Sequence, residues 1–278
     1  FKNIVPQLAS FSKLPFCIDT THPLALETAL KLYPGRALIN SISGEEERLN
    51  TILPLMKKYG AYAILLPLNE EGIPDSVQGR LNIIQEILKK AQEFGVPSYA
   101  FIVDALVMTV SASPHFSPLS LQTIQEAYTQ FGLSSTCGLS NISFGLPGRN
   151  ALNAAFLTML MGAGLDCAIL NPQDPIIQVF THASSVLTLR DENALQYIKK
   201  YASIKNFFTQ DSTPNLEKTL DSQNHHSKPK EDLSWQEQLK KSIVEGHKDF
   251  IQEIIKVGLT HTNPSDIVNN IMIPAITL

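Results

Sequence analysis

Basic runs and long apolar stretches are both missing from this 278-residue sequence, and each absence excludes a class of function. Lysine and arginine total 22 against 26 acidic residues, for a formal net charge of −4. No nucleic-acid-binding surface is therefore expected. No apolar stretch reaches the roughly 20 residues of a membrane-spanning helix, and the first residues lack a signal-peptide pattern. We expect a cytoplasmic protein with neither a membrane nor a nucleic acid as partner.

Cysteine and paired histidine are also scarce. Three cysteines occur, an odd number, and each of them (Cys17, Cys137 and Cys167) lies in an apolar stretch. We expect free thiols packed in the core of a protein from a reducing compartment. The seven histidines include no pair at metal-ligand spacing. The sequence therefore predicts no metal site.

Short apolar segments alternate with amphipathic ones over residues 1–203. Six segments are typical of buried strands: 15–19, 36–40, 61–68, 98–104, 135–141 and 166–171. Between them, residues 49–59 and 121–131 place their apolar side chains on one face of a helix. Buried strands that alternate with helices indicate parallel β/α units.

A glycine-rich phosphate-binding turn is missing after the first predicted strand, where an open doubly wound sheet would carry one. We therefore predict an α/β fold, a (β/α)8 TIM barrel, and keep the open sheet as the alternative. The predicted strands are two fewer than a closed barrel needs. Because the sequence begins at Phe1 without a methionine, we expect a fragment whose barrel lacks its first two β/α units.

The alternating pattern ends near residue 203. Residues 204–232 are polar, contain proline and serine and show no apolar periodicity, which predicts a linker. Residues 233–278 have a helical pattern and form a small all-α segment, with an apolar stripe at Phe250, Ile254 and Val257. We expect domains at 1–203 and 233–278 with few contacts between them, and a stripe that is partly exposed.

Every predicted strand ends in an aspartate or an asparagine. These residues are Asp19, Asn40, Asn69, Asp104, Asn141 and Asn171. Helix capping explains any one of them, but caps are equally often serine, threonine or glycine. Since the carboxyl ends of barrel strands converge on the face that holds the active site, the set indicates a ligand site.

The chemistry of these strand ends limits the ligand. No lysine stands among them, and a phosphate favours lysine, arginine or a helix N-terminus. Carboxylates and amides match a planar, uncharged ring that carries N–H donors and carbonyl acceptors. A pterin is such a ring, because its amino and ring N–H groups can pair with one carboxylate in two parallel hydrogen bonds.

Three segments carry a family resemblance: CIDTTHPLALETALKLYPGRALINSIS, YAFIVDALV and CGLSNISFGLPGRNALNAAFLTMLMGAGLDCAILNP. They resemble the folate-binding barrel of cobalamin-dependent methionine synthase and the stand-alone methyltetrahydrofolate:corrinoid methyltransferases, over roughly residues 1–201. The resemblance implies a methyltransferase that binds 5-methyltetrahydrofolate. It also implies that the methyl group passes to the Co(I) of a corrinoid, as part of methionine synthesis from homocysteine.

The same resemblance implies roles for individual residues. Asp19, Asn40 and Asp104 match residues that hold the pterin ring. Asn141 matches the residue near the methyl-bearing nitrogen, and we expect it to be catalytic, donating a hydrogen bond as charge develops there. No side chain in the sequence is typical of a tuned general acid, so positioning and electrostatics are expected to dominate.

Three more residues complete the predicted substrate-binding set. Ser140 and Asn171 belong to the late strand ends. Arg149 follows in a loop, where it either meets the glutamate tail of folate or is an ordinary solvated arginine. The family usually has proline where Ala105 stands, which leaves the shape of the loop after Asp104 open.

Residues 233–278 resemble, less specifically, the helical cap that precedes cobalamin-binding domains in the same enzymes. Ordinary packing of a small helical bundle is the alternative. The D-x-H-x-x-G motif that supplies the lower cobalt ligand does not occur in the sequence. Cobalamin is therefore expected on a corrinoid-binding partner domain that lies mostly outside this chain.

Two other functions stay open. A dihydropteroate synthase on the same barrel must bind a pyrophosphate leaving group, which favours lysine, arginine or histidine at late strand ends. Asn141 and Asn171 stand there instead. The third possibility is a fragment that binds a pterin without catalysing a reaction.

Overall fold

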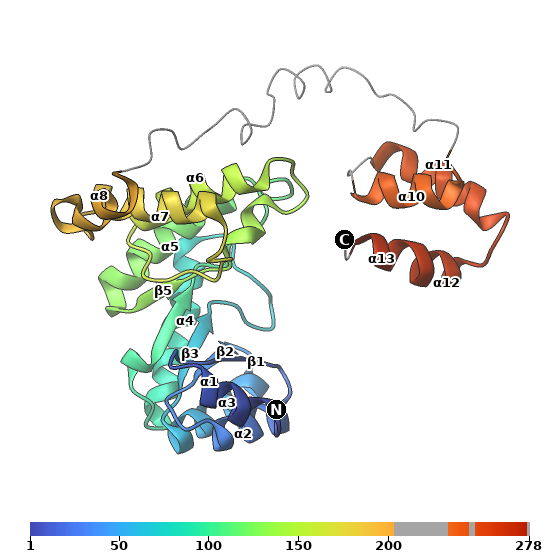
Figure 1. Ribbon diagram of the computed structural model, residues 1–278. Helices are drawn as coiled ribbons and strands as arrows, with labels where there is room; N and C mark the ends of the chain where they lie inside the picture. The colour runs from blue at the N-terminus through green and yellow to red at the C-terminus, as the bar shows by residue number, and fades with distance from the viewer. Residues whose placement is uncertain (203–232, 245–247, 277–278) are drawn as a thin grey trace. The chain divides into compact units, whose positions relative to one another are not determined.

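Five parallel strands form the sheet of the computed structural model, which describes residues 1–202, 233–244 and 248–276 (Figure 1). The strands are β1 (Cys17–Asp19), β2 (Leu38–Ser43), β3 (Tyr62–Leu66), β4 (Phe101–Asp104) and β5 (Ser134–Thr136). Their order is β1-β2-β3-β4-β5, so each strand pairs with the next along the chain. The order never reverses as it does in a doubly wound sheet. Right-handed crossovers then place the connecting helices on one face.

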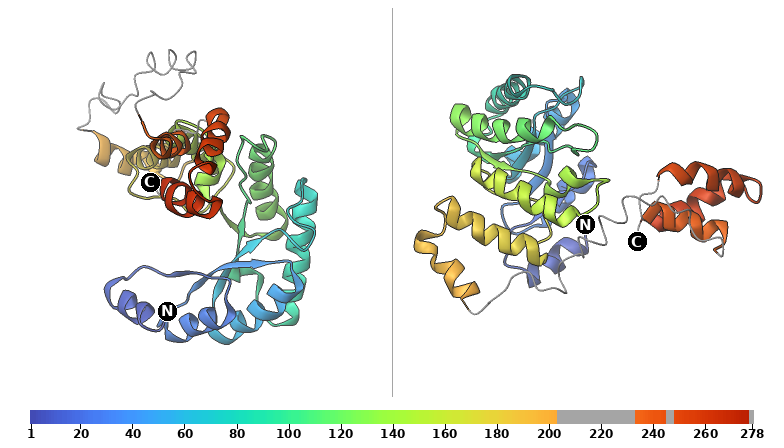
Figure 2. Two further views of the ribbon diagram at one scale, coloured as in Figure 1. Left: turned by 90° about the vertical axis from the view of Figure 1, so that its right-hand side faces the viewer. Right: turned by 90° about the horizontal axis from the view of Figure 1, so that it is seen from above.

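Helices connect these strands and follow them. They are α1 (Ile4–Phe11), α2 (Pro23–Leu32), α3 (Glu46–Tyr59), α4 (Val77–Glu93), α5 (Phe116–Phe131), α6 (Arg149–Gly162), α7 (Pro175–Leu187) and α8 (Leu195–Tyr201), with short 3-10 turns η1 (Ser98–Ala100), η2 (Leu139–Ser143) and η3 (Glu192–Ala194). Helices α2 to α5 pack against one another in succession, and Figure 2 (left) shows the blue-to-green helices along one side of the strands. The helices predicted at 49–59 and 121–131 are confirmed within α3 and α5.

The core of this unit lies between the strands and the helices. Ile39 and Ala63 are register partners on β2 and β3, and both are fully buried. Ile52 and Leu53 of α3 are fully buried in the same apolar cluster. Each large aliphatic side chain buried in this way contributes roughly 1.5–3 kcal/mol. Helix α3 then ends at Gly60, whose φ of 65° suits a residue without a Cβ.

The prediction of a full sixth strand at 166–171 is wrong. It forms an isolated parallel bridge between Ile169 and Gly138. Backbone N–H groups nevertheless continue the pairing: Cys167 donates to the Ser135 carbonyl at 3.1 Å and Ile169 to the Cys137 carbonyl at 2.8 Å. The segment pairs on one side only within the described residues, and β5 itself gives way to the turn η2 after Thr136. The ladder is therefore too short to count as a strand.

The cysteines divide into two environments. Cys137 is buried, as predicted, but Cys17 and Cys167 are exposed, which corrects the expectation that all three pack in the core. Cys17 belongs to β1, the first strand of the sheet, and Cys167 to the segment beside β5, the last. Each therefore has a neighbouring strand on one side only, which leaves its thiol in contact with solvent.

A second compact unit spans Ser203–Leu278, after the first unit at Phe1–Ala202. Its described elements are α10 (Trp235–Val244), α11 (Lys248–Leu259), α12 (Pro264–Ile267), the π-helical turn η5 (Val268–Met272) and α13 (Ile273–Ile276). Leu239 is fully buried in its small core, and Ile254 is 8% exposed while Val257 is 48% exposed. The predicted stripe is therefore split between core and surface, and the Phe250 side chain lies outside the described residues. So does the predicted linker at 204–232.

Among the described helices, none combines the length and the apolar composition that a membrane span requires.

Candidate functional site

Asp19, the last residue of β1, and Asn40, within β2, lie side by side. They are register partners, so their side chains leave the sheet on the same face, on strands about 4.8 Å apart. Asp19 is exposed and Asn40 is half-buried. Within the part of the chain that the structure describes, neither side chain makes a hydrogen bond. Both polar groups are therefore available to a ligand.

Asp104 reaches the same face from β4. Asn40 is in register with Ile64, and Ile64 with Ile102. Because side chains alternate along a strand, Asp104 lies on the same face as Ile102, two residues before it. The structure thus brings Asp19, Asn40 and Asp104 together at the carboxyl end of one sheet face.

The carboxyl group of Asp104 has an unusual environment. Burial raises the pKa of Asp104 to about 6, against two lowering influences, a hydrogen bond from the Leu106 N–H and the charge of Arg80. The Leu106 N–H donates to Oδ1 over 2.7 Å, and Leu106 itself has a φ of 48°. Asp104 is therefore a buried carboxyl group with a pKa well above its ordinary value.

Arg80 of α4 is the functional candidate that sequence reasoning missed. Its side chain is fully buried. Nη1 donates to the Ala105 carbonyl over 2.7 Å and Nε to the Pro74 carbonyl over 3.2 Å, and the guanidinium lies 5.1 Å from the Phe116 ring centroid. Burial lowers the pKa of Arg80 to about 10, although nearby carboxylates raise it, so the charge persists at neutral pH.

A sequence signal for Arg80 does exist. It lies four, seven and eleven residues before Ile84, Ile87 and Ala91, which are fully buried on the same face of α4. A basic residue at a core-facing helix position implies a buried partner. The partner here is a backbone carbonyl, which no sequence pattern marks.

Asn141 lies in the 3-10 turn η2, after β5. Its side chain is exposed and makes no hydrogen bond within the described ranges. A Cβ on Gly138 would lie 3.2 Å from Asn141 Nδ2. Because Gly138 has no Cβ, it leaves room for the side-chain amide of Asn141.

Arg149, the first residue of α6, is tied into the same turn. Nη2 donates to the Ser140 carbonyl over 2.9 Å and Nε to Ser143 Oγ over 3.1 Å. Ser143 Oγ in turn donates to Asn153 Oδ1 over 2.8 Å. Arg149 is therefore not an ordinary solvated arginine, although its side chain is exposed.

A cleft of about 460 Å³ opens beside this turn, lined among others by Ser140, Arg149 and Asn171. Asn171 Oδ1 accepts a hydrogen bond from the Gln173 N–H over 3.0 Å, so part of its side chain is used in a local turn. The predicted residues thus form two groups: Asp19, Asn40 and Asp104 on the sheet face, and the three cleft residues together with Asn141, which follows Ser140 in the turn η2.

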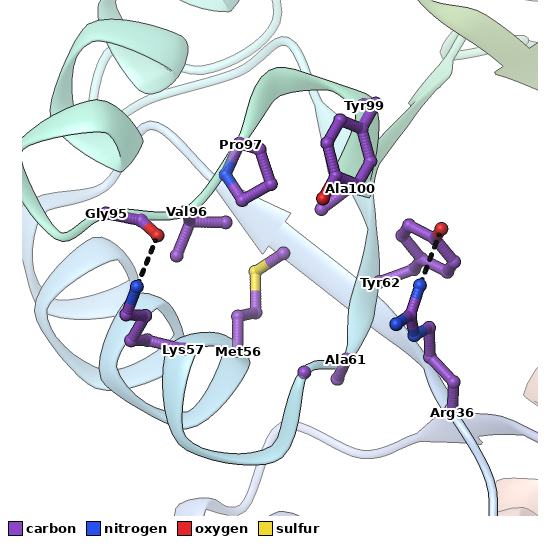
Figure 3. Close-up of a pocket in the computed structure, with 11 residues that line it drawn as sticks. Arg36, Met56, Lys57, Ala61, Tyr62, Gly95, Val96, Pro97, Tyr99 and Ala100 are labelled. Atoms are coloured by element: carbon purple, nitrogen blue, oxygen red, sulfur yellow. Dashed lines mark hydrogen bonds between the residues drawn. The ribbon is translucent and has the colours of Figure 1, made fainter.

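A smaller cavity, of about 190 Å³, lies at the opposite ends of the strands (Figure 3). Arg36 donates to the Tyr62 hydroxyl over 3.0 Å at its wall, and Lys57 donates to the Gly95 carbonyl. Arg36 and Tyr62 stand where β2 and β3 begin. The cavity is therefore remote from the polar strand ends.

Metal-ligand geometry is a separate question. Among the described residues, no three side chains of histidine, cysteine, aspartate or glutamate gather where they could hold a metal ion.

Solved structures of dihydropteroate synthases share the fold of the first unit. The enzyme of Yersinia pestis, with a pterine-sulfa conjugate, matches with a TM-score of 0.53 at 17% identity, over 67% of this chain and 72% of that chain. The 7,8-dihydropteroate synthase of Vibrio fischeri ES114 matches with a TM-score of 0.54 at 16% identity, over 66% and 72%. At such identities the likeness shows an α/β fold of this type and nothing about activity.

Two relatives are more similar in sequence. The methylcorrinoid:tetrahydrofolate methyltransferase of Eubacterium limosum is 28% identical over 192 residues, which are 67% of this chain and 70% of that protein. The methionine synthase of Mycobacterium tuberculosis is 30% identical over 201 residues, 68% of this chain. The chain spans only 16% of that methionine synthase.

The family model for pterin binding enzymes matches residues 1–171. This range contains Asp19, Asn40, Asp104 and Asn141, together with the β/α units that carry them. The chain therefore belongs to the pterin binding enzyme family, and its first unit is a pterin-binding domain related to a methylcorrinoid:tetrahydrofolate methyltransferase and to methionine synthases.

Proposed function

We propose that this chain binds 5-methyltetrahydrofolate and transfers its methyl group to the Co(I) of a corrinoid. The observation that carries the proposal is the set of uncommitted polar side chains at the strand ends. Asp19, Asn40 and Asn141 make no hydrogen bond within the described residues, and Asp104 is bonded through one oxygen to Leu106. A pterin supplies the N–H donors and carbonyl acceptors that these groups lack.

The pterin ring is held by complementary hydrogen bonds. The carboxylates of Asp19 and Asp104 accept its N–H groups, and the amide of Asn40 on the same face donates to its carbonyl oxygen. The charge-assisted bonds to a carboxylate are the stronger ones. Because Asp104 titrates near pH 6, we expect pterin affinity to fall as the pH drops through that value.

Asn141 acts on the methyl-bearing nitrogen. A tertiary amine is a poor leaving group, so this nitrogen must gain a hydrogen bond or a proton as the carbon–nitrogen bond breaks. The exposed amide of Asn141 can donate that hydrogen bond, and a preorganised donor stabilises the transition state more than the bound substrate. Ser140, Arg149 and Asn171 line the neighbouring cleft, where the remainder of the folate would extend.

The methyl acceptor comes from outside this chain. The corrinoid supplies a nucleophilic cobalt that takes the methyl group. No D-x-H-x-x-G motif is present to ligate it, so the residues of this chain do not fit a resident corrinoid, and we assign them to the folate alone. Residues 233–278 are proposed to begin the helical cap of the partner domain.

Methionine synthesis is the pathway proposed for this transfer. The relative from Eubacterium limosum is named for a methylcorrinoid and tetrahydrofolate, and the mycobacterial relative for methionine synthesis. Methyl transfer passes through the same transition state in either direction, so the roles of the folate-binding residues do not depend on the direction of transfer.

A (β/α)8 barrel without its first two units is the proposed architecture. β1 pairs with one strand only within the described residues, and the segment at 166–170 likewise pairs with one neighbour. Two further β/α units between these free edges would close the barrel.

Dihydropteroate synthesis is the second candidate, favoured by the shared fold. It requires a basic group that is free to bind pyrophosphate. Arg149 is the basic residue beside the late strand ends, and its Nε and Nη2 already donate to Ser143 and Ser140. A pterin-binding fragment without activity is the third candidate.

Methyl transfer to cob(I)alamin tests the proposal, in this chain and in a version extended upstream. We expect Asn141→Ala to lower the transfer rate about 100-fold and to change methyltetrahydrofolate affinity much less. Equal losses in rate and affinity would contradict the role of Asn141. Condensation of a pterin pyrophosphate with aminobenzoate would favour the second candidate, and binding without any transfer the third.

A further inference from the structure

Three arginines of the first unit bind backbone carbonyls at the carboxyl ends of the strands. Each stands among the first four residues of its helix, and helices of β/α units begin at the end of the sheet where the strands finish. Each carbonyl directly adjoins, in the sequence, a residue of the proposed pterin site. The pairs are Arg48 with Ser41 (next to Asn40), Arg80 with Ala105 (next to Asp104) and Arg149 with Ser140 (next to Asn141).

Arg48 of α3 joins two strand ends. Nη2 donates to the Ser41 carbonyl on β2, and Nη1 to the Thr21 carbonyl, two residues beyond Asp19. One guanidinium therefore fixes the spacing between Asp19 and Asn40, the two register partners.

Arg80 joins the loop after β3 to the loop after β4, through the Pro74 and Ala105 carbonyls. Its Nη2 is buried and makes no hydrogen bond to any described residue. Its positive charge also acts on Asp104 and favours the ionised carboxylate. Arg80 thus fixes the backbone next to Asp104 and favours the ionised form of the Asp104 carboxyl group.

Arginine suits this task better than lysine. The guanidinium is planar, carries five N–H donors in a fixed plane and stays charged when buried. It can therefore bind two acceptors from two loops at once. An ammonium group donates from a single nitrogen atom, whereas Arg48 and Arg80 each reach two carbonyls from two separate nitrogen atoms.

We propose that Arg48, Arg80 and Arg149 are positioning residues that hold the polar strand ends in the geometry that binds the pterin. This inference rests on the pterin site proposed above. In this role none of the three is required to touch the pterin ring.

Arg190 provides a matched control. It donates from Nη1 to the Leu165 carbonyl over 2.6 Å, which is the same kind of bond. That carbonyl lies before the segment at 166–170, at the end of the sheet away from the site. Loss of the Arg190 bond should cost stability without cost to pterin affinity.

The test measures the affinity for methyltetrahydrofolate by calorimetry and unfolding by circular dichroism. The proteins are wild type and the variants Arg48→Met, Arg149→Met, Arg80→Lys, Arg80→Met and Arg190→Met. They are made in this chain or in the version extended upstream, whichever binds methyltetrahydrofolate. We expect the first two variants to bind about tenfold or more weakly, while Arg190→Met binds as wild type does. Ethylguanidinium should restore part of the affinity of Arg149→Met, because Arg149 is exposed.

Arg80→Lys separates positioning from plain stability. Lysine keeps the charge and loses one of the two carbonyls, so binding should weaken while the pH midpoint of binding stays near that of wild type. Arg80→Met removes the charge as well, and that midpoint should move to higher pH.

Equal affinity in wild type, Arg48→Met and Arg149→Met would overturn the inference while leaving the pterin site in place. So would a loss in Arg190→Met as large as in those two. Absence of binding in wild type, with or without the upstream extension, would overturn the proposed function and the inference together.

Discussion

Replacing Asp104 by asparagine should stabilise the protein and weaken its site at the same time. The substitution keeps the shape of the side chain and an oxygen for the Leu106 N–H, which donates to Oδ1 over 2.7 Å. It removes a buried negative charge, and burial is the largest influence on the pKa of Asp104. A binding site that is held at a cost in stability should respond in this way.

The magnitude follows from the pKa of Asp104, which burial raises from 3.8 to about 6. Each pKa unit corresponds to about 1.4 kcal/mol, so the ionised group costs about 3 kcal/mol above pH 6. The folded state holds this proton more tightly than the unfolded state. Stability from this group is therefore greatest below about pH 4 and falls as the pH rises to about 6.

Urea denaturation of wild type and Asp104→Asn at pH 5 and pH 8 measures this difference. We expect the variant to be more stable by up to about 3 kcal/mol at pH 8 and by about half as much at pH 5. Methyltetrahydrofolate affinity should fall at pH 8, where the lost group is a carboxylate. A variant no more stable than wild type at pH 8 would refute the dominance of burial.

Three further perturbations test other parts of the structure. Gly138→Ala places a Cβ 3.2 Å from Asn141 Nδ2. The displaced amide should slow methyl transfer about tenfold with little change in the free energy of unfolding. An unchanged rate would contradict the proposed position of the Asn141 amide at the methyl-bearing nitrogen. Gly258→Ala would put a Cβ 2.6 Å from a ring carbon of Trp235; overpacking should destabilise the second unit by about 1–3 kcal/mol, followed through the fluorescence of the one tryptophan in the sequence. Burial raises the pKa of all three cysteine thiols, but only Cys137 is buried while Cys17 and Cys167 are exposed. A thiol reagent should therefore label the two exposed cysteines first, and rapid labelling of Cys137 in folded protein would contradict its burial.

The sequence predicted those features of the fold that depend on periodicity. The spacing of Ile52, Leu53 and Met56 places one buried face on α3, and the structure buries all three. The strand ends were predictable only in part: Asp19 and Asp104 end β1 and β4, whereas β2 continues past Asn40 to Ser43, and Asn69 and Asn141 lie beyond the ends of β3 and β5. The segment at 166–171 was not predictable, since its pairing depends on how far β5 extends before the turn at Gly138.

The supporting contacts of the site were beyond sequence reasoning. Arg80 bonds to Pro74 and Ala105, one of them 25 residues away along the chain. Likewise, the pKa of Asp104 depends on burial by elements that are distant in sequence. Local patterns identify the groups at the strand ends, whereas the protonation and positioning of those groups are properties of the assembled sheet.

Calorimetric titration of methyltetrahydrofolate against wild type, Asn40→Ala and Arg36→Ala tests the central claim most directly. Asn40 lies on the sheet beside Asp19, the last residue of β1, whereas Arg36 binds the Tyr62 hydroxyl at the other end of the strands. We predict that wild type and Arg36→Ala bind with equal affinity and that Asn40→Ala binds at least about tenfold more weakly. Equal binding by all three proteins, or a loss confined to Arg36→Ala, would contradict the assignment of the strand ends to the pterin.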